Sequence, residues 1–173
     1  IQEAQQYFAN SYVVRDFALD SADELAKILA EARAVRRAAA APELGLFVRL
    51  ALPRGGAVYD LSGKFGAEID DAAALLRAAR PHARALGLAF HVGSQALDPL
   101  AYARAIERAQ AAIAASGVTV DVLDVGGGFP VSYPDVTPPP LGAYMAEIEA
   151  AVERMGALAP AALWAEPGRA LVA

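Results

Sequence analysis

Three consecutive glycines stand at the end of an apolar segment and could bind an anion. Gly126, Gly127 and Gly128 follow the apolar run 118–125, within the string Leu-Asp-Val-Gly-Gly-Gly-Phe-Pro. Without side chains, their backbone N–H groups could approach a phosphate closely. Glycine runs after strands also form ordinary turns, so this motif alone leaves both an anion site and a turn open.

A histidine and a serine follow a second apolar run, in the string Phe-His-Val-Gly-Ser-Gln. His91 would supply an aromatic ring, and Gly93 and Ser94 would supply a bare N–H and a hydroxyl at the same strand end. This combination suits a phosphate group attached to an aromatic ring. The alternative is that His91 is a hydrogen-bonded residue of the core.

An acid and an arginine follow a third apolar run, in the string Ala-Glu-Pro-Gly-Arg. The Glu166 carboxylate would lie at the end of an apolar strand shielded from water, and it would be costly to bury without a partner. Arg169 could form a local ion pair with it. Alternatively, Arg169 binds an anion and Glu166 binds a cationic ligand group. A carboxylate beside a ring nitrogen raises the pKa of that nitrogen, as the pyridinium of pyridoxal phosphate (PLP) requires.

These motifs need a fold that brings the ends of separate strands together. Apolar runs predict strands at 15–19, 44–50, 87–92, 119–125 and 162–166, and amphipathic stretches predict helices at 21–40, 67–86, 99–116 and 141–158. Ser21 and Glu24 have the spacing of a capping box. Strand spacings of roughly 30 to 40 residues suit βαβ units in a parallel sheet. A partial (β/α)₈ barrel and an open doubly wound sheet both remain, and both place ligands at the C-terminal strand ends.

Two connections are longer than usual for such units. The segment 53–66 contains Leu-Ser-Gly-Lys-Phe-Gly and is a candidate binding or interface loop. The segment 130–140 ends in three prolines, and we interpret it as a semi-rigid surface connector.

Composition excludes several classes of protein. The chain has 173 residues, of which 56% are hydrophobic, which suffices for one domain with a core. It has no cysteine and a net charge of −5, so disulfides, thiolate metal sites and nucleic-acid binding are not expected. No apolar stretch reaches the ~18 residues of a membrane span, so we expect a soluble, cytoplasmic protein. We also expect no metal site. A helix is expected at 1–12 without a start signal, which indicates a segment of a longer protein.

Four strings in this order and spacing resemble the PLP-dependent ornithine/diaminopimelate/arginine decarboxylase family, which has an alanine-racemase-like barrel. They are Leu-Ser-Gly-Lys-Phe-Gly, Phe-His-Val-Gly-Ser-Gln, Leu-Asp-Val-Gly-Gly-Gly-Phe-Pro and Ala-Glu-Pro-Gly-Arg, and they cover essentially the whole chain. Phe129-Pro130 after the glycines is similar to ornithine decarboxylases. The resemblance implies an α/β fold, with 1–173 as a single incomplete PLP-binding (β/α)₈-barrel domain comprising roughly the last five βα units. The first strands and the C-terminal β-domain would be absent.

The resemblance also implies roles for particular residues. His91 would stack on the cofactor ring, and Glu166 would bond to the pyridine nitrogen, which makes these two the catalytic candidates. Ser94, Arg169 and the three glycines would hold the phosphate of PLP. Lys64 would lie toward the partner subunit of a homodimer with shared active sites. Asp60 stands where eukaryotic ornithine decarboxylases carry an arginine, so the role of that arginine is in doubt here.

The Schiff-base lysine of this family lies on the first barrel strand, upstream of this chain. The only lysines here are Lys27, expected in a helix, and Lys64, expected in a loop, and neither would form the bond to PLP. The fragment alone is therefore expected to be inactive.

The resulting hypothesis is PLP-dependent decarboxylation of a basic amino acid, foremost L-ornithine to putrescine in polyamine biosynthesis. The alternatives within the family are a diaminopimelate or lysine decarboxylase and a non-catalytic regulatory homologue similar to antizyme inhibitors. A nucleotide-binding open sheet is disfavoured, because the glycines lead into a proline-rich loop where a dinucleotide fingerprint would lead into a helix.

Overall fold

A twisted parallel sheet forms the centre of the molecule. The computed structural model of the chain describes residues 14–36, 43–53, 57–59 and 65–173. The strands of the main sheet are β1 (Asp16–Leu19), β2 (Leu44–Arg49), β4 (Ala83–Ala89), β6 (Val122–Asp124) and β7 (Ala162–Trp164). All neighbouring pairs are parallel, as the sequence predicts.

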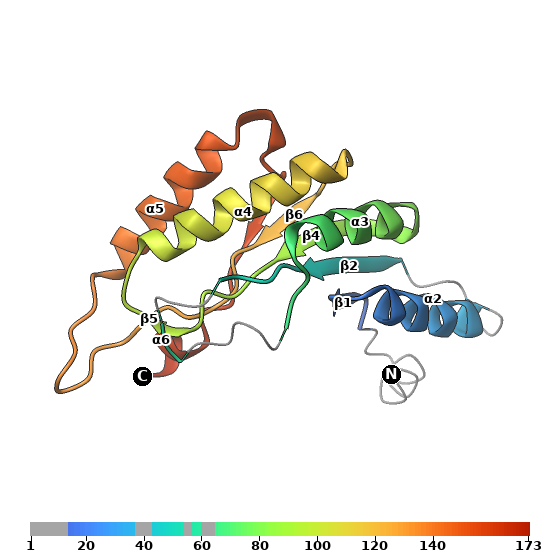
Figure 1. The fold of residues 1–173 in the computed structure, drawn as a ribbon. Helices are drawn as coiled ribbons and strands as arrows, with labels where there is room; N and C mark the ends of the chain where they lie inside the picture. Colours follow the sequence, from blue (N-terminus) through green and yellow to red (C-terminus); the bar gives the residue numbers. More distant parts are fainter. Residues whose placement is uncertain (1–13, 37–42, 54–56, 60–64) are drawn as a thin grey trace.

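The order of the strands decides between the two expected architectures. The sheet runs β1-β2-β4-β6-β7, so each strand lies beside the previous one in the chain. A doubly wound sheet reverses its order at a switch point, whereas a barrel adds strands in one direction. The helices α3 (Ile69–Ala79), α4 (Leu100–Ser116) and α5 (Leu141–Arg154) lie along one side of this sheet (Figure 1). The fold is therefore part of a (β/α)₈ barrel, which confirms the first of the two expectations.

Alternation along the strands separates a helix-covered face from an interior face. Leu46, Val48, Leu86, Leu88 and Leu123 are almost completely buried and belong to one apolar cluster with residues of the helices. Among the intervening positions, Phe47, Arg49, Ala89 and Asp124 line a cavity described below. A strand face that excludes long aliphatic side chains leaves room for a ligand, and the other face anchors the helices.

The first helix, α2 (Ala22–Arg36), begins as expected but with half of the predicted capping box. The Ser21 hydroxyl accepts a hydrogen bond from the Glu24 N–H at 3.2 Å. The Glu24 carboxylate does not return the contact and instead pairs with Lys27. Lys27 is therefore an exposed helix residue, as expected, and lies away from the strand ends.

The predicted end of the helix before β4 is wrong. The helix expected at 67–86 ends at Ala79, and a short 3₁₀ turn, η1 (Arg80–His82), leads into β4 at Ala83. Pro81 lies in this turn, where its missing N–H and its ring stop an α-helix. The strand expected at 87–92 therefore starts four residues earlier and ends at Ala89.

Smaller elements were not predicted. The strands β3 (Ala57–Tyr59) and β5 (Ser94–Ala96) form an antiparallel pair next to the main sheet. The helix expected at 141–158 divides into α5 and the 3₁₀ turn η2 (Gly156–Leu158). A short helix, α6 (Gly168–Val172), follows β7. No helix in the described ranges is long and apolar enough to cross a membrane.

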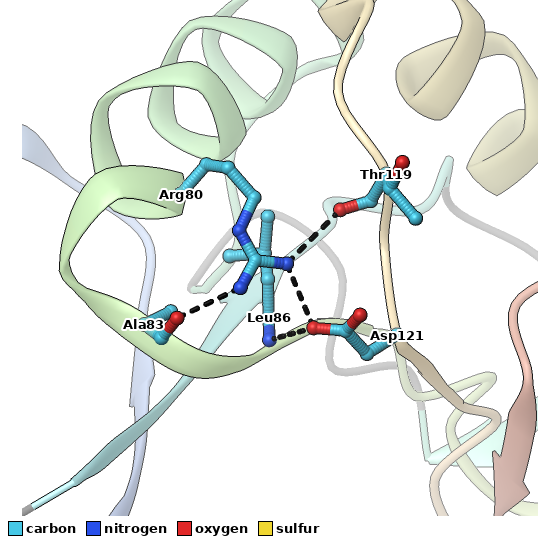
Figure 2. Close-up of polar contacts among 5 residues, drawn as sticks. All are labelled: Arg80, Ala83, Leu86, Thr119 and Asp121. Atoms are coloured by element: carbon cyan, nitrogen blue, oxygen red, sulfur yellow. Dashed lines mark hydrogen bonds and ion pairs between the residues drawn. The ribbon is translucent and has the colours of Figure 1, made fainter.

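Arg80 and Asp121 join the amino-terminal parts of two neighbouring strands, β4 and β6 (Figure 2). The Arg80 guanidinium donates to the Asp121 carboxylate at 2.7 Å and to the carbonyls of Ala83 and Thr119 at 2.7 and 3.2 Å. The Asp121 carboxylate also accepts from the Leu86 N–H at 2.8 Å. These contacts tie the turn before β4 to the segment before β6, at the end of the sheet opposite the motifs.

We expect Asp121→Asn to lower the free energy of unfolding by about 1 kcal/mol at neutral pH, since it weakens charge-assisted hydrogen bonds. Burial raises the pKa of Asp121, but the Leu86 N–H and the Arg80 guanidinium outweigh it, and the pKa is lowered. A lowered pKa stabilises the fold above the unfolded value of about 4, and this contribution is lost as the pH falls below it. Urea titrations from pH 7 to pH 3 should show the deficit of the variant shrinking.

The matched control for this prediction is Asp135→Asn, because Asp135 is an exposed residue of the 130–140 connector. Its unfolding free energy should follow that of the parent protein at every pH. A deficit for Asp121→Asn that stays constant down to pH 3 would contradict a role for its charge.

Candidate functional site

A cavity lies on the interior face of the sheet, at the C-terminal ends of the strands. Its volume is about 490 Å³, within the range of small-molecule sites. Strand register explains the choice of lining residues, because Arg49, Ala89, Asp124 and Trp164 are partners in one row across four strands. Residues paired in this way point to the same face, and all four line the cavity. Trp164 also stacks on Phe47, with 5.0 Å between ring centroids.

His91 lines this cavity directly after β4. Its Nδ1 accepts a hydrogen bond from the Gly93 N–H at 2.9 Å, so Nδ1 carries no proton. Partial burial lowers the pKa of His91, the positive charge of Arg49 lowers it further, and Asp124 opposes both. The imidazole is therefore held neutral, with its remaining proton on Nε2. A neutral ring can stack on an aromatic ligand without the cost of desolvating a charge.

Glu166 enters the same cavity from the end of β7. Partial burial raises the pKa of its carboxyl, the negative charge of Asp124 adds to this, and Arg49 opposes it. The carboxyl thus lies in a site with a deficit of positive charge, and a cationic group of a ligand would lower its pKa. Within the described residues no ion pair joins Glu166 to Arg169, so of the two alternatives for these residues the local ion pair is not formed.

The three glycines pack between the segments that carry His91 and Glu166. A Cβ on Gly126 would lie 2.1 Å from the Phe90 carbonyl oxygen, and a Cβ on Gly127 would lie 2.6 Å from the Glu166 carbonyl oxygen. A Cβ on Gly128 would lie 2.2 Å from the Gly93 carbonyl oxygen. Each distance is shorter than any real contact of this kind, so the strand ends could not approach one another with larger residues here.

The glycine N–H groups differ in their availability. The Gly126 N–H donates to the Asp124 carboxylate at 2.8 Å, so it is already used. In the part of the chain that the structure describes, the N–H groups of Gly127 and Gly128 have no acceptor. An oxyanion is the kind of ligand that two adjacent free N–H groups bind. Two of the three predicted donors are thus available.

The remaining predicted residues lie further from the cavity. Ser94 begins β5 directly after Gly93, whose N–H donates to His91 Nδ1, and is partly buried. Arg169 is exposed on α6, and its guanidinium donates to the Tyr133 hydroxyl at 2.5 Å. Neither residue lines the cavity with His91 and Glu166. Lys64 and Asp60, as well as the helix expected at 1–12, lie outside the described residues.

Asp124 and Arg49 are site residues that sequence reasoning missed. The negative charge of Asp124 acts to raise the pKa of both His91 and Glu166. Asp124 is 9% exposed, and its carboxylate accepts a hydrogen bond from the Gly126 N–H. Each of the two is a lone charge at the end of an apolar strand, which is a signal that the sequence did contain.

The site is therefore suited to a small aromatic or cationic ligand that also bears an anionic group. The described residues contain no group of three or more acidic or histidine side chains that could hold a metal. The sequence model of the family "Pyridoxal-dependent decarboxylase, pyridoxal binding domain" matches residues 2–173. The chain belongs to this family.

Members of the pyridoxal-dependent decarboxylase family are similar to the chain in sequence and in structure. The lysine/ornithine decarboxylase of Selenomonas ruminantium is 36% identical over 165 residues, covering 93% of the chain and 39% of that protein. Antizyme inhibitor 2 of Mus musculus is 32% identical over 133 residues, covering 75% of the chain and 27% of that protein. The structure of SrLDC in complex with PLP and cadaverine matches with a TM-score of 0.71 and 34% identity, covering 93% of the chain and 39% of that structure.

The chain thus spans about two fifths of the length of these decarboxylase relatives. The predicted cofactor of the pyridoxal-dependent family is confirmed, since the matched domain is a pyridoxal binding domain and a solved relative contains PLP. The residues of the cavity, together with the glycine motif beside it, also fit PLP. His91 offers a neutral ring, Glu166 has no ion-pair partner among the described residues, and the N–H groups of Gly127 and Gly128, which do not line the cavity, are free for a phosphate.

Proposed function

We propose that the full-length protein carrying this chain is a PLP-dependent decarboxylase of a basic amino acid, foremost L-ornithine. The observation that supports this most is that His91 and Glu166 enter one cavity at the C-terminal strand ends, on the interior face of a barrel sheet. The name of the Selenomonas relative includes both lysine and ornithine, so L-lysine is the second candidate.

The residues of this chain would divide the work of binding and orienting the cofactor. When bound, PLP supplies an electron-accepting ring for the electrons left on the substrate as carbon dioxide departs. Glu166 would hold a proton on the ring nitrogen, because a carboxylate beside that nitrogen favours its charged form. His91 would cover one face of the ring. The free N–H groups of Gly127 and Gly128 would bind phosphate oxygens, with Ser94 and Arg169 as further donors.

Arg49 and Asp124 would set the charge of these groups. Burial lowers the pKa of His91 most, and the positive charge of Arg49 lowers it further. Its guanidinium lies over the Phe65 ring, 5.1 Å from the centroid, which fixes its direction. Asp124 keeps the surroundings of Glu166 negative, which strengthens the attraction of this end of the cavity for a protonated ring nitrogen.

The proposal extends to the assembly and location of the protein. A cytoplasmic homodimer with shared active sites, with Lys64 near the interface, follows from the resemblance of the motifs to ornithine decarboxylases. Conversion of L-ornithine to putrescine would place the protein in polyamine biosynthesis. A diaminopimelate decarboxylase and a regulatory homologue similar to antizyme inhibitor 2 are the alternatives, since relatives with these names are 36% and 32% identical to the chain.

We expect the PLP-loaded full-length protein to release carbon dioxide and form putrescine from L-ornithine. Rates with L-lysine, L-arginine and meso-diaminopimelate should be compared under the same conditions, with the amine product identified by mass spectrometry. Faster release from diaminopimelate would reassign the substrate. A protein that shows neither a PLP absorbance band nor carbon dioxide release would contradict the proposal and favour a regulatory homologue.

A further inference from the structure

Tyr102 contacts the glycine motif from outside the barrel. It lies on α4, is fully buried, and its hydroxyl donates to the Gly127 carbonyl oxygen at 3.0 Å. Its ring stacks on Phe129, with 5.0 Å between centroids and 15° between planes, and Tyr144 packs edge-on against it at 6.0 Å. Burial and the neighbouring Tyr144 raise the pKa of Tyr102, so the hydroxyl keeps its proton and remains a donor.

Each of the three glycine carbonyls has its own hydrogen-bond donor. The Gly126 carbonyl accepts from the Glu166 N–H at 2.8 Å, and the Gly128 carbonyl accepts from the Ala96 N–H at 3.0 Å. The donor to the Gly127 carbonyl is the Tyr102 hydroxyl, the only side chain of the three. The donors to the Gly126 and Gly128 carbonyls are thus backbone N–H groups that almost any sequence would supply. The donor to the Gly127 carbonyl depends on the residue type at position 102.

A fixed carbonyl also fixes the direction of the next N–H. The described residues contain no cis peptide bond, and in a trans peptide the C=O and the N–H point in opposite directions. The Gly127 carbonyl points to α4, so the Gly128 N–H points away from α4. Without the Tyr102 hydroxyl this peptide joins two glycines and could rotate at little steric cost. Its carbonyl would also lose its buried partner.

We propose that Tyr102 is a positioning residue for the phosphate of the cofactor. Its hydroxyl, held by the aromatic cluster of Tyr102, Phe129 and Tyr144, aims the free Gly128 N–H at the anion. The inference rests on the proposed function, because it assumes that the glycine motif binds the phosphate of PLP. It adds a contact to the glycine motif from an outer-helix residue that does not line the cavity.

The test compares Tyr102→Phe with Tyr144→Phe in the full-length apoprotein. Tyr144 is a matched control, since it is fully buried in the same cluster and its hydroxyl donates to a backbone carbonyl, that of Ala96, at 2.9 Å. Dissociation constants are measured by absorbance for PLP and for pyridoxal, which lacks the phosphate. Tyr102→Phe should weaken PLP binding about 3- to 10-fold and leave pyridoxal binding within about 2-fold, as expected for one lost hydrogen bond. Tyr144→Phe should change neither dissociation constant.

Three outcomes would overturn the inference, and they are distinguishable. Equal weakening of PLP and pyridoxal by Tyr102→Phe would show a general structural role. Equal effects of the two variants on the ratio of PLP to pyridoxal affinity would show that the aromatic cluster, and not the contact to Gly127, matters. A parent protein that binds both ligands equally would instead contradict the phosphate site, and with it the proposed function.

Discussion

Replacing Glu166 with glutamine is expected to lower kcat of the PLP-loaded full-length protein on the order of 100-fold or more. Glutamine keeps the size of the side chain but carries no charge, so it cannot hold a proton on the ring nitrogen. The affinity for PLP should change much less, because the contacts of the phosphate to Gly127 and Gly128 are untouched. Steady-state kinetics and a PLP titration of the same preparation separate the two effects.

Glu153→Gln is the control for this substitution. Glu153 is an exposed residue of α5, so the same chemical change there should leave kcat and PLP affinity as in the parent protein. A near-parental kcat for Glu166→Gln would contradict the role assigned to this carboxylate. A loss of PLP binding as large as the loss of kcat would show that Glu166 holds the cofactor and does not act on its chemistry.

Gly128→Ala is expected to have the largest effect on stability. Gly128 has φ +100°, where L side chains are strained, and its Cβ would lie 2.2 Å from the Gly93 carbonyl oxygen. Strain and overpacking together should lower the free energy of unfolding by about 3 kcal/mol. This is a large part of the total stability of an ordinary domain. Urea unfolding of the full-length apoprotein measures it.

Gly142→Ala provides the comparison, because Gly142 lies in α5 and a Cβ there would meet no atom within 4 Å. Alanine favours helix more than glycine does, so this variant should be as stable as the parent or more stable by about 0.5 kcal/mol. If Gly128→Ala unfolded at the same urea concentration as Gly142→Ala, the close packing of the glycine motif would be refuted.

The parallel sheet and its helices could be predicted from the sequence because their signals are local. Apolar runs and amphipathic stretches alternate at the spacing of βαβ units. The choice between a barrel and a doubly wound sheet could not be made from these patterns alone, because both alternate in the same way. The order of the strands in space decides it, and that order follows from packing between distant segments.

The end of α3 was misplaced because alanine-rich sequence does not distinguish a helix from the start of a buried strand. Residues 83–86 extend the predicted helical pattern, although Pro81 precedes them. In the structure the Leu86 N–H binds Asp121, a residue 35 positions away. A contact of this range has no signal in the local sequence, so the proline was the available warning.

The site was predicted in part. His91 and Glu166 were expected at the ends of separate strands on either side of the glycine motif, and the structure places both at one cavity. Asp124 was not predicted as a site residue, although it lies two residues before Gly126. Its effect on the pKa values of His91 and Glu166 depends on strand register, which sequence does not show. The partner of Arg169 is likewise a distant residue, Tyr133.

The central claim is that this cavity binds PLP between His91 and Glu166, with the phosphate on the glycine motif. A crystal structure of the full-length protein loaded with PLP tests it most directly. The account predicts the ring nitrogen within about 3 Å of the Glu166 carboxylate, and phosphate oxygens within about 3 Å of the Gly127 and Gly128 nitrogens. A cofactor whose phosphate lies away from these glycines, or whose ring nitrogen faces away from Glu166, would contradict it.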